Sequence, residues 1–149
     1  GSYKKLLWMM FISFAAMFIL MYAMLDKLEN VIPNVNQFYM AGLMASPMLL
    51  IELLLMQKMY PHKKFNVSLM GLGLVLLLLF WSGIRKQTAV DDIQFLKSMI
   101  PHHAGAILMV EESQLEDPEV KKLAEEIISA QNREIEFMKA KIRQLEKKE

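Results

Sequence analysis

The sequence contains no cysteine and only three histidines among its 149 residues. Without cysteine, the chain can form neither a disulfide nor a thiolate metal site. Any chemistry with soft metal ions must therefore use the thioether of methionine and the imidazole of histidine. Methionine is plentiful, with 14 residues.

Charged residues are scarce before about residue 85, and 54% of the chain is hydrophobic. Such a chain is either a membrane protein or a soluble protein with a very apolar core, and the lengths of the apolar runs decide between them. Three stretches reach the roughly 20 mostly apolar residues that a membrane helix needs. They cover about residues 6–25, 38–59 and 67–84, and we expect all three to cross a membrane. A cleaved signal peptide is the alternative for the first stretch, but its apolar run is too long and no small-residue cleavage site follows it.

Basic residues flank the three expected spans unequally. One side of the membrane would hold Lys4, Lys5, Lys58, Lys63 and Lys64, and the other Lys27, Arg85 and Lys86. Because cytoplasmic loops carry an excess of Lys and Arg, we expect the N-terminus in the cytoplasm and everything after the third span outside it. The expected location is the cytoplasmic (inner) membrane of a bacterium, as a multi-pass protein.

The charge of the chain changes sign after the third expected span. Residues 1–90 carry a net charge of +5 and residues 91–149 a net charge of −4, from the counts of Lys, Arg, Asp and Glu in each part. We therefore expect a membrane anchor at 1–88 and a separate, water-facing domain at 89–149. An acidic domain argues against nucleic acid as a partner.

The acidic domain is predicted to fold as an antiparallel helical hairpin, so that the whole chain is all-α. Its first helix covers about 91–115, with a kink or restart at Pro101, because proline lacks the N–H of the helix ladder. Its second helix covers about 118–147, since Asp117 is suited to the N-cap and Pro118 to the first helical position. A hairpin of about 59 residues is too small to bury both apolar faces by itself. We expect two copies to complete a four-helix bundle.

The stretch MIPHH, Met99 to His103, places two adjacent histidines after a methionine. At about 100° per residue, His103 falls on the same helical stripe as Met99, while His102 and Met109 lie side by side on its flank. Imidazole suits several transition metals, whereas a thioether is a useful ligand chiefly for soft ions such as Cu(I) and Ag(I). Histidine and methionine without cysteine therefore favour copper over zinc. A helix N-terminus near Pro101 would also keep both rings neutral and able to coordinate.

The second helix of the hairpin carries two polar residues, Gln131 and Glu134, within its apolar stripe. Polar groups there are costly unless other polar groups meet them, and the histidines of the facing helix are the obvious partners. Glu134 or Gln131 would then hold the second nitrogen of a coordinating histidine and fix its tautomer. The candidate metal ligands are His102, His103, Met99, Met109 and Met138, with Glu134 and Gln131 as the supporting residues.

Each candidate also has a purely structural interpretation. A histidine pair on a helix is often hydrogen-bonded or solvated, and methionine is a common filler of helical cores. In the second span, Met40, Met44 and Met48 recur every four residues along one face, an arrangement that could pass soft ions across the membrane. The favoured interpretation is that these methionines pack against other helices or face lipid. Glu52, one turn further, is harder to explain in this way, because an ionisable group at membrane depth usually faces a partner or water.

Several motifs of the acidic domain together match a known family pattern. They are Phe95, MIPHH at Met99 to His103, AILM at Ala106 to Met109, Asp117-Pro118, and the series Ala124, Ile127, Ile128, Gln131, Glu134, Ile135 and Met138. Through these motifs, the segment of about residues 90–145 resembles the family catalogued as domain of unknown function 305. The preceding spans resemble the membrane-anchored members of that family. The resemblance implies a ferritin-like helical fold and, for some members, binding of cuprous or silver ions through His and Met in copper handling.

We therefore expect a membrane-anchored protein that binds Cu(I), or a similar soft ion such as silver, for sequestration, relay or resistance; another transition metal is the less favoured ion. One alternative is a ferritin-like redox enzyme, but such enzymes normally use several carboxylates with Glu-x-x-His pairs, and no such pair is present. The other alternative is a structural oligomerisation module without metal, in which the histidine pair packs an interface. The expected partners are the lipid bilayer, a second copy of the chain and the metal ion.

Overall fold

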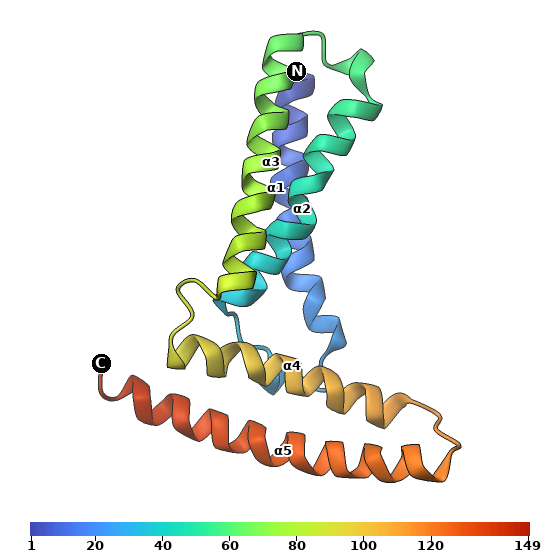
Figure 1. The fold of residues 1–149 in the computed structure, drawn as a ribbon, viewed down its shortest axis with the longest axis vertical. Coiled ribbons are helices and arrows are strands. Elements are labelled where there is room, and N and C mark those ends of the chain that lie inside the picture. Colours follow the sequence, from blue (N-terminus) through green and yellow to red (C-terminus); the bar gives the residue numbers. More distant parts are fainter. The chain divides into compact units, whose positions relative to one another are not determined.

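The computed structural model describes residues 1–149 as five α-helices without any β-strand. The helices are α1 (Ser2–Leu20), α2 (Val35–Leu55), α3 (Lys63–Lys86), α4 (Asp92–Glu112) and α5 (Pro118–Glu146) (Figure 1). The all-α fold predicted from the sequence is thus confirmed. The chain divides into two compact units: a span unit of residues 1–21 and 36–88, and a hairpin unit of residues 22–35 and 89–149.

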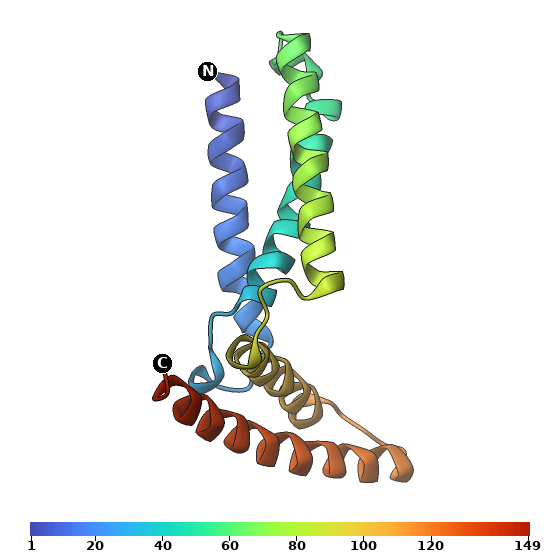
Figure 2. The same cartoon turned by 60° about the vertical axis from the view of Figure 1, so that its left-hand side comes forward.

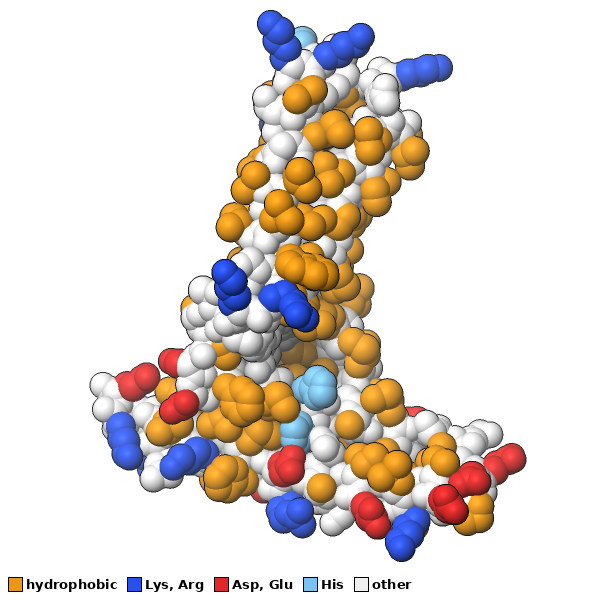
Figure 3. Space-filling model, viewed as in Figure 1, with side chains coloured by type: hydrophobic (Ala, Val, Ile, Leu, Met, Phe, Trp, Pro, Cys, Tyr) orange, Lys and Arg blue, Asp and Glu red, His pale blue; other side chains and the backbone are white.

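Three helical segments of the chain are long and apolar enough to cross a membrane. They are Ser2–Met24, in which a 3-10 turn extends α1, Val35–Leu55 and Lys63–Lys86. The prediction of three such helices is confirmed, and hydrophobic side chains are spread along the visible surface of the span unit (Figure 3). The second helix ends at Leu55 instead of near residue 59, because Met56 leaves the helical region and Gln57–Met59 forms a separate 3-10 turn.

Small residues line the contact between α2 and α3. A Cβ atom added at Gly42 would lie 2.4 Å from Cζ of Phe80, so only glycine lets this ring reach the backbone of α2. Ala41, Ala45 and Ser46 are also buried. The Ser46 hydroxyl donates to the Gly42 carbonyl at 2.6 Å, which satisfies its polar group within the helix. Small side chains of this kind let membrane helices approach closely.

Polar contacts tie the first turn of α1 to the loop that precedes α3. The Tyr3 hydroxyl accepts a hydrogen bond from the His62 N–H at 3.0 Å and donates to Asn66 Oδ1 at 2.5 Å. The Asn66 amide donates to the Tyr60 carbonyl at 2.8 Å. Tyr60 is buried with Leu6 in the core that joins the three helices at this end. The α2–α3 loop therefore holds α1 in place in the span unit.

In the hairpin unit, α4 and α5 run antiparallel and share one core (Figures 1 and 2). Its buried residues are Ile100, Ala104 and Ile107 from α4 and Ile135, Met138 and Ile142 from α5. The start of α5 is as predicted: the Asp117 carboxylate accepts from the N–H groups of Glu119 and Val120 at 2.9 and 3.0 Å, and Pro118 takes the first helical position.

The first helix of the hairpin differs from the prediction at Pro101. The cap is Asp91, whose carboxylate accepts from the Gln94 N–H at 2.8 Å, and α4 continues without a break through Pro101. The predicted restart is therefore wrong. Proline removes one hydrogen bond of the ladder, but the fully buried Ile100 and Ala104 on either side of it hold the helix against α5. The histidines lie in the middle of this helix, so no helix N-terminus acts on them.

The segment between α1 and α2 belongs to the hairpin unit, which the sequence did not indicate. Leu25 and Ile32 pack against the core of the hairpin. Asn30 is fully buried, and its amide donates to Asp26 Oδ1 at 2.8 Å. Residues 22–35 thus add apolar burial that two helices alone would lack.

Replacing Gly42 by alanine is expected to destabilise the span unit by about 1–3 kcal/mol, because the new methyl group would displace the Phe80 ring. Gly71 on α3 is the matched control: nothing lies within 4 Å of the position its Cβ would take, so Gly71→Ala should be neutral or slightly stabilising. Thermal unfolding of both variants in mild detergent measures the difference. Equal midpoints would contradict the close packing of α2 against α3.

Candidate metal site

His103, in the middle of α4, meets Glu134, in the middle of α5. The His103 Nε2 atom and the Glu134 Oε2 atom are 2.5 Å apart. The His103 side chain is 9% exposed and that of Glu134 is 52% exposed. The pair therefore sits at the edge of the hairpin core, with the imidazole inside and the carboxylate reaching solvent. Two of the residues singled out in the sequence are thus brought together.

The second ring nitrogen of His103 has no hydrogen-bond partner. Its Nδ1 atom is buried and faces neither a donor nor an acceptor. Because a carboxylate only accepts, Nε2 carries the proton of the contact with Glu134, and in the tautomer with a single ring proton Nδ1 holds a free lone pair. A buried polar atom without a partner costs about 1–3 kcal/mol and is rare in folded proteins. A metal ion would accept this lone pair.

Two of the predicted sulfur ligands lie one helical turn from this pair. Met99 precedes His103 by four residues on α4, and Met138 follows Glu134 by four residues on α5, so each shares a face with its neighbour. Met138 is buried in the hairpin core and Met99 packs against it. Both methionines thus contribute to the hairpin core, one helical turn along α4 or α5 from the pair.

The remaining predicted ligands lie apart from the pair. His102 is exposed, and its ring centroid is 6.4 Å from that of His103. Met109 is 65% exposed and lies six residues beyond His103, about 9 Å along the helix axis. Gln131 is partly buried in the stripe that faces α4. No three His, Cys, Asp or Glu side chains come together in the chain, so one chain offers one buried imidazole with nearby thioethers.

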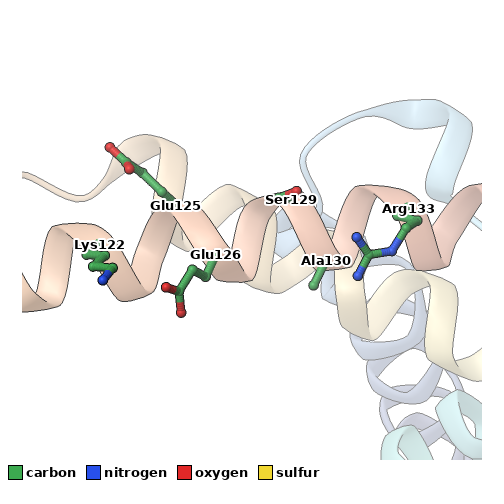
Figure 4. A pocket seen from close by; sticks show the side chains of 6 residues that line it. All are labelled: Lys122, Glu125, Glu126, Ser129, Ala130 and Arg133. Atoms are coloured by element: carbon green, nitrogen blue, oxygen red, sulfur yellow. The ribbon is translucent and has the colours of Figure 1, made fainter.

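A shallow depression on the outer surface of α5 offers no comparable site. It is lined by Lys122, Glu125, Glu126, Ser129, Ala130 and Arg133 (Figure 4). All six residues come from the same helix, and no second element faces them. Positive and negative side chains alternate there, as on a solvated helix surface.

The residues singled out in the second span have structural partners or face outward. Met40 and Met44 are 46% and 44% exposed, as lipid-facing residues would be. Glu52 accepts a hydrogen bond from the Tyr60 hydroxyl at 3.2 Å, which supplies the partner that a carboxylate at this depth requires. Burial, together with the Glu52 carboxylate, raises the pKa of Tyr60 above its usual value.

Asn30 is a buried polar residue that sequence reasoning missed. Its Oδ1 atom is buried without a hydrogen-bond partner, although its amide nitrogen donates to Asp26. The only signal was a run of polar residues between two spans. Because residues 22–35 show neither helical nor strand periodicity, nothing in the sequence placed them against the hairpin.

Comparisons with known proteins point to the same region. The sequence profile of the family described as Domain of unknown function (DUF305) matches residues 84–149. An uncharacterized protein of Acanthamoeba polyphaga mimivirus is 34% identical over 107 residues, which cover 70% of this chain and 68% of the relative. The chain belongs to the DUF305 family. No solved structure gave a significant match.

The DUF305 region contains the whole candidate site. His103, Glu134 and the two nearby methionines all lie within residues 84–149. The alignment with the viral protein is longer than this region, so the similarity extends into the preceding part of the chain. Membership of the DUF305 family, expected from the MIPHH motif and the pattern of the second helix, is thus confirmed.

Glu134→Gln is expected to lower the stability of the DUF305 hairpin, because a neutral amide is a weaker acceptor for His103 than a carboxylate. Since Glu134 is half exposed, the loss should be only about 0.5–1 kcal/mol. Glu136→Gln, two residues further on the exposed side of α5, is the matched control and should leave stability unchanged. Circular dichroism melts of the full chain measure both variants, and equal melting temperatures would count against a stabilising pair.

Proposed function

We propose that this DUF305 protein is a membrane-anchored binding protein for Cu(I), or for a similar soft ion such as Ag(I), and that it sequesters or relays the ion. The observation that supports this most strongly is the buried Nδ1 atom of His103, which has no partner while Glu134 holds Nε2. A carboxylate behind an imidazole orients the ring, fixes its tautomer and makes the other nitrogen a better ligand. The ion is cargo, and the protein is not an enzyme.

The groups around His103 favour a soft ion. Met99 and Met138 offer thioether sulfur, which is a useful ligand chiefly for Cu(I) and Ag(I). A structural zinc site takes four ligands, and a ferritin-like redox site takes several carboxylates with Glu-x-x-His pairs. No three His, Cys, Asp or Glu side chains meet in this chain, so its residues suit neither of those sites.

A structural module without metal is the second candidate. The packing of Met99 and Met138 in the hairpin core favours this candidate. Methionine commonly fills helical cores, so packing alone can explain both residues. Under this alternative, the contact between His103 and Glu134 would serve only to pair the two helices. The two candidates differ in what the methionine sulfur does, and ion binding separates them.

We also propose that the hairpin unit lies outside the cytoplasm, at the face of a bacterial inner membrane. Residues 22–35 and 89–149 form one compact unit, and two crossings by α2 and α3 between them would put both on the same side, which supports this orientation. The α2–α3 loop then lies on the other side, together with Lys58, Lys63 and Lys64. An excess of basic residues is typical of the cytoplasmic side.

Cysteine labelling is expected to give this orientation directly, because the chain has no cysteine of its own. Glu116→Cys, in the exposed linker between α4 and α5, should react with a membrane-impermeant maleimide in intact spheroplasts. Gln57→Cys, in the loop between α2 and α3, should react only after lysis. The opposite pattern would place the hairpin in the cytoplasm and remove the proposed orientation.

Competition against a cuprous chelator under reducing conditions is expected to separate the ligand types. Changing His102 and His103 together to alanine should abolish tight binding of every metal. Met99→Leu and Met138→Leu roughly conserve volume, so they should weaken Cu(I) binding and leave zinc binding nearly unchanged. Met44→Leu, on the outer surface of α2, is the matched control and should bind as the wild type does.

Circular dichroism of each variant shows whether its helices persist. A folded double-histidine variant with the cuprous affinity of the wild type would overturn the metal-binding proposal and leave the structural module.

A further inference from the structure

The α4 helix carries an apolar seam beside the contact with α5. Its residues are Phe95, Met99, His102, Ala106 and Met109, which follow one another at alternating intervals of four and three. This interval is the repeat by which one helix packs lengthwise against another. Phe95 and Met109 are 52% and 65% exposed, so the seam is open along most of its length.

A matching seam runs along α5. Its residues are Val120, Leu123, Ile127, Ala130, Glu134 and Phe137, at alternating intervals of three and four. Val120, Leu123 and Phe137 are 45%, 55% and 66% exposed. Because His103 contacts Glu134 at the edge of the hairpin core, the two seams lie on the same side of the hairpin, which we name the open face. In Figure 3, hydrophobic side chains gather around the histidines of the hairpin.

The open face approaches the size of the surface that one partner contributes to a standard dimer interface. Its exposed apolar side chains present on the order of 500 Å² of surface, more than half of the roughly 800 Å² that each partner buries in a standard interface. Two parallel seams require a partner that also presents two helices, and a second hairpin does so. The net charge of −4 on residues 91–149 makes an anionic lipid surface a poor occupant.

A twofold arrangement of hairpins would bring the histidines of two chains together. His102 is the middle residue of the 21 that form α4. A twofold interface makes every contact reciprocal, and an axis that passes the middle of α4 would bring the middle of one α4 to the middle of the other. His102 of the second copy would therefore approach the His103 and Glu134 of the first.

The candidate site needs such a contribution. Within one chain, Glu134 occupies Nε2 of His103 and Nδ1 has no hydrogen-bond partner, while His102 lies on the exposed side of the helix. We propose that a second copy of the chain docks on the open face and that its His102 completes the ion site begun by His103. This inference rests on the proposed function, and it names the partner and the ligand that the site requires.

Complementation between two inactive variants tests the shared site. Full-length chains with different affinity tags are co-produced, one with His102→Ala and the other with His103→Gln, and the heterodimer is isolated in mild detergent by two successive affinity steps. Glutamine retains a hydrogen-bond donor for Glu134, which protects the fold. Neither variant alone should retain Cu(I). In the heterodimer, one of the two symmetric sites keeps both histidines, so it should bind half of the wild-type copper content with wild-type affinity.

The possible outcomes separate this inference from the proposed function. If the wild type binds copper but the heterodimer binds no more than either variant alone, the shared site is wrong and the proposed function stands. The shared site is also wrong if the copper-loaded wild type is monomeric in detergent. It is equally wrong if the His102→Ala chain binds copper by itself. If the wild type binds no copper, both proposals fail.

Discussion

The contact between His103 and Glu134 is the constraint on which the chemistry of the hairpin depends. An imidazole inside an apolar core is costly unless its nitrogens are satisfied, and Glu134 satisfies only one of them. The apolar core of α4 and α5 determines which way the ring faces, because Ile100 and Ile135 hold the two helices in register. The unpaired nitrogen therefore follows from the packing, and the ion site that we propose depends on it.

The two units of the chain bury their apolar side chains in different ways. Residues 22–35, between α1 and α2, supply Leu25 and Ile32 to its core and so stabilise it without a third long helix. On the open face, Phe95, Met109 and Phe137 are exposed. In the span unit, by contrast, glycines admit large side chains of neighbouring helices, as Gly42 does for Phe80, and Tyr60 closes the loop end. The span unit thus needs no second copy to satisfy its polar groups there, whereas the hairpin site does under our proposal.

Much of this organisation is predictable from the sequence, because it depends on local signals. Apolar runs indicate the spans, and Asp117 with Pro118 marks the start of α5. Pro101 shows the limit of such signals: its local preference for ending a helix is outweighed by buried neighbours that only the fold brings together. The packing of residues 22–35 depends on contacts with residues far along the chain and has no periodic signature. Likewise, the adjacency of His102 and His103 does not show which ring is buried, because that depends on how α4 is rotated against α5.

We propose that the imidazole of His103 and thioether sulfur together hold a soft ion. X-ray absorption spectroscopy at the copper edge, on the full chain loaded with Cu(I) in detergent and freed of excess metal, tests it most directly. Copper bound at His103 is expected to show imidazole nitrogen and sulfur together in the coordination sphere of the reduced ion. A spectrum without imidazole, or a chain that retains no copper after removal of the excess, would contradict it.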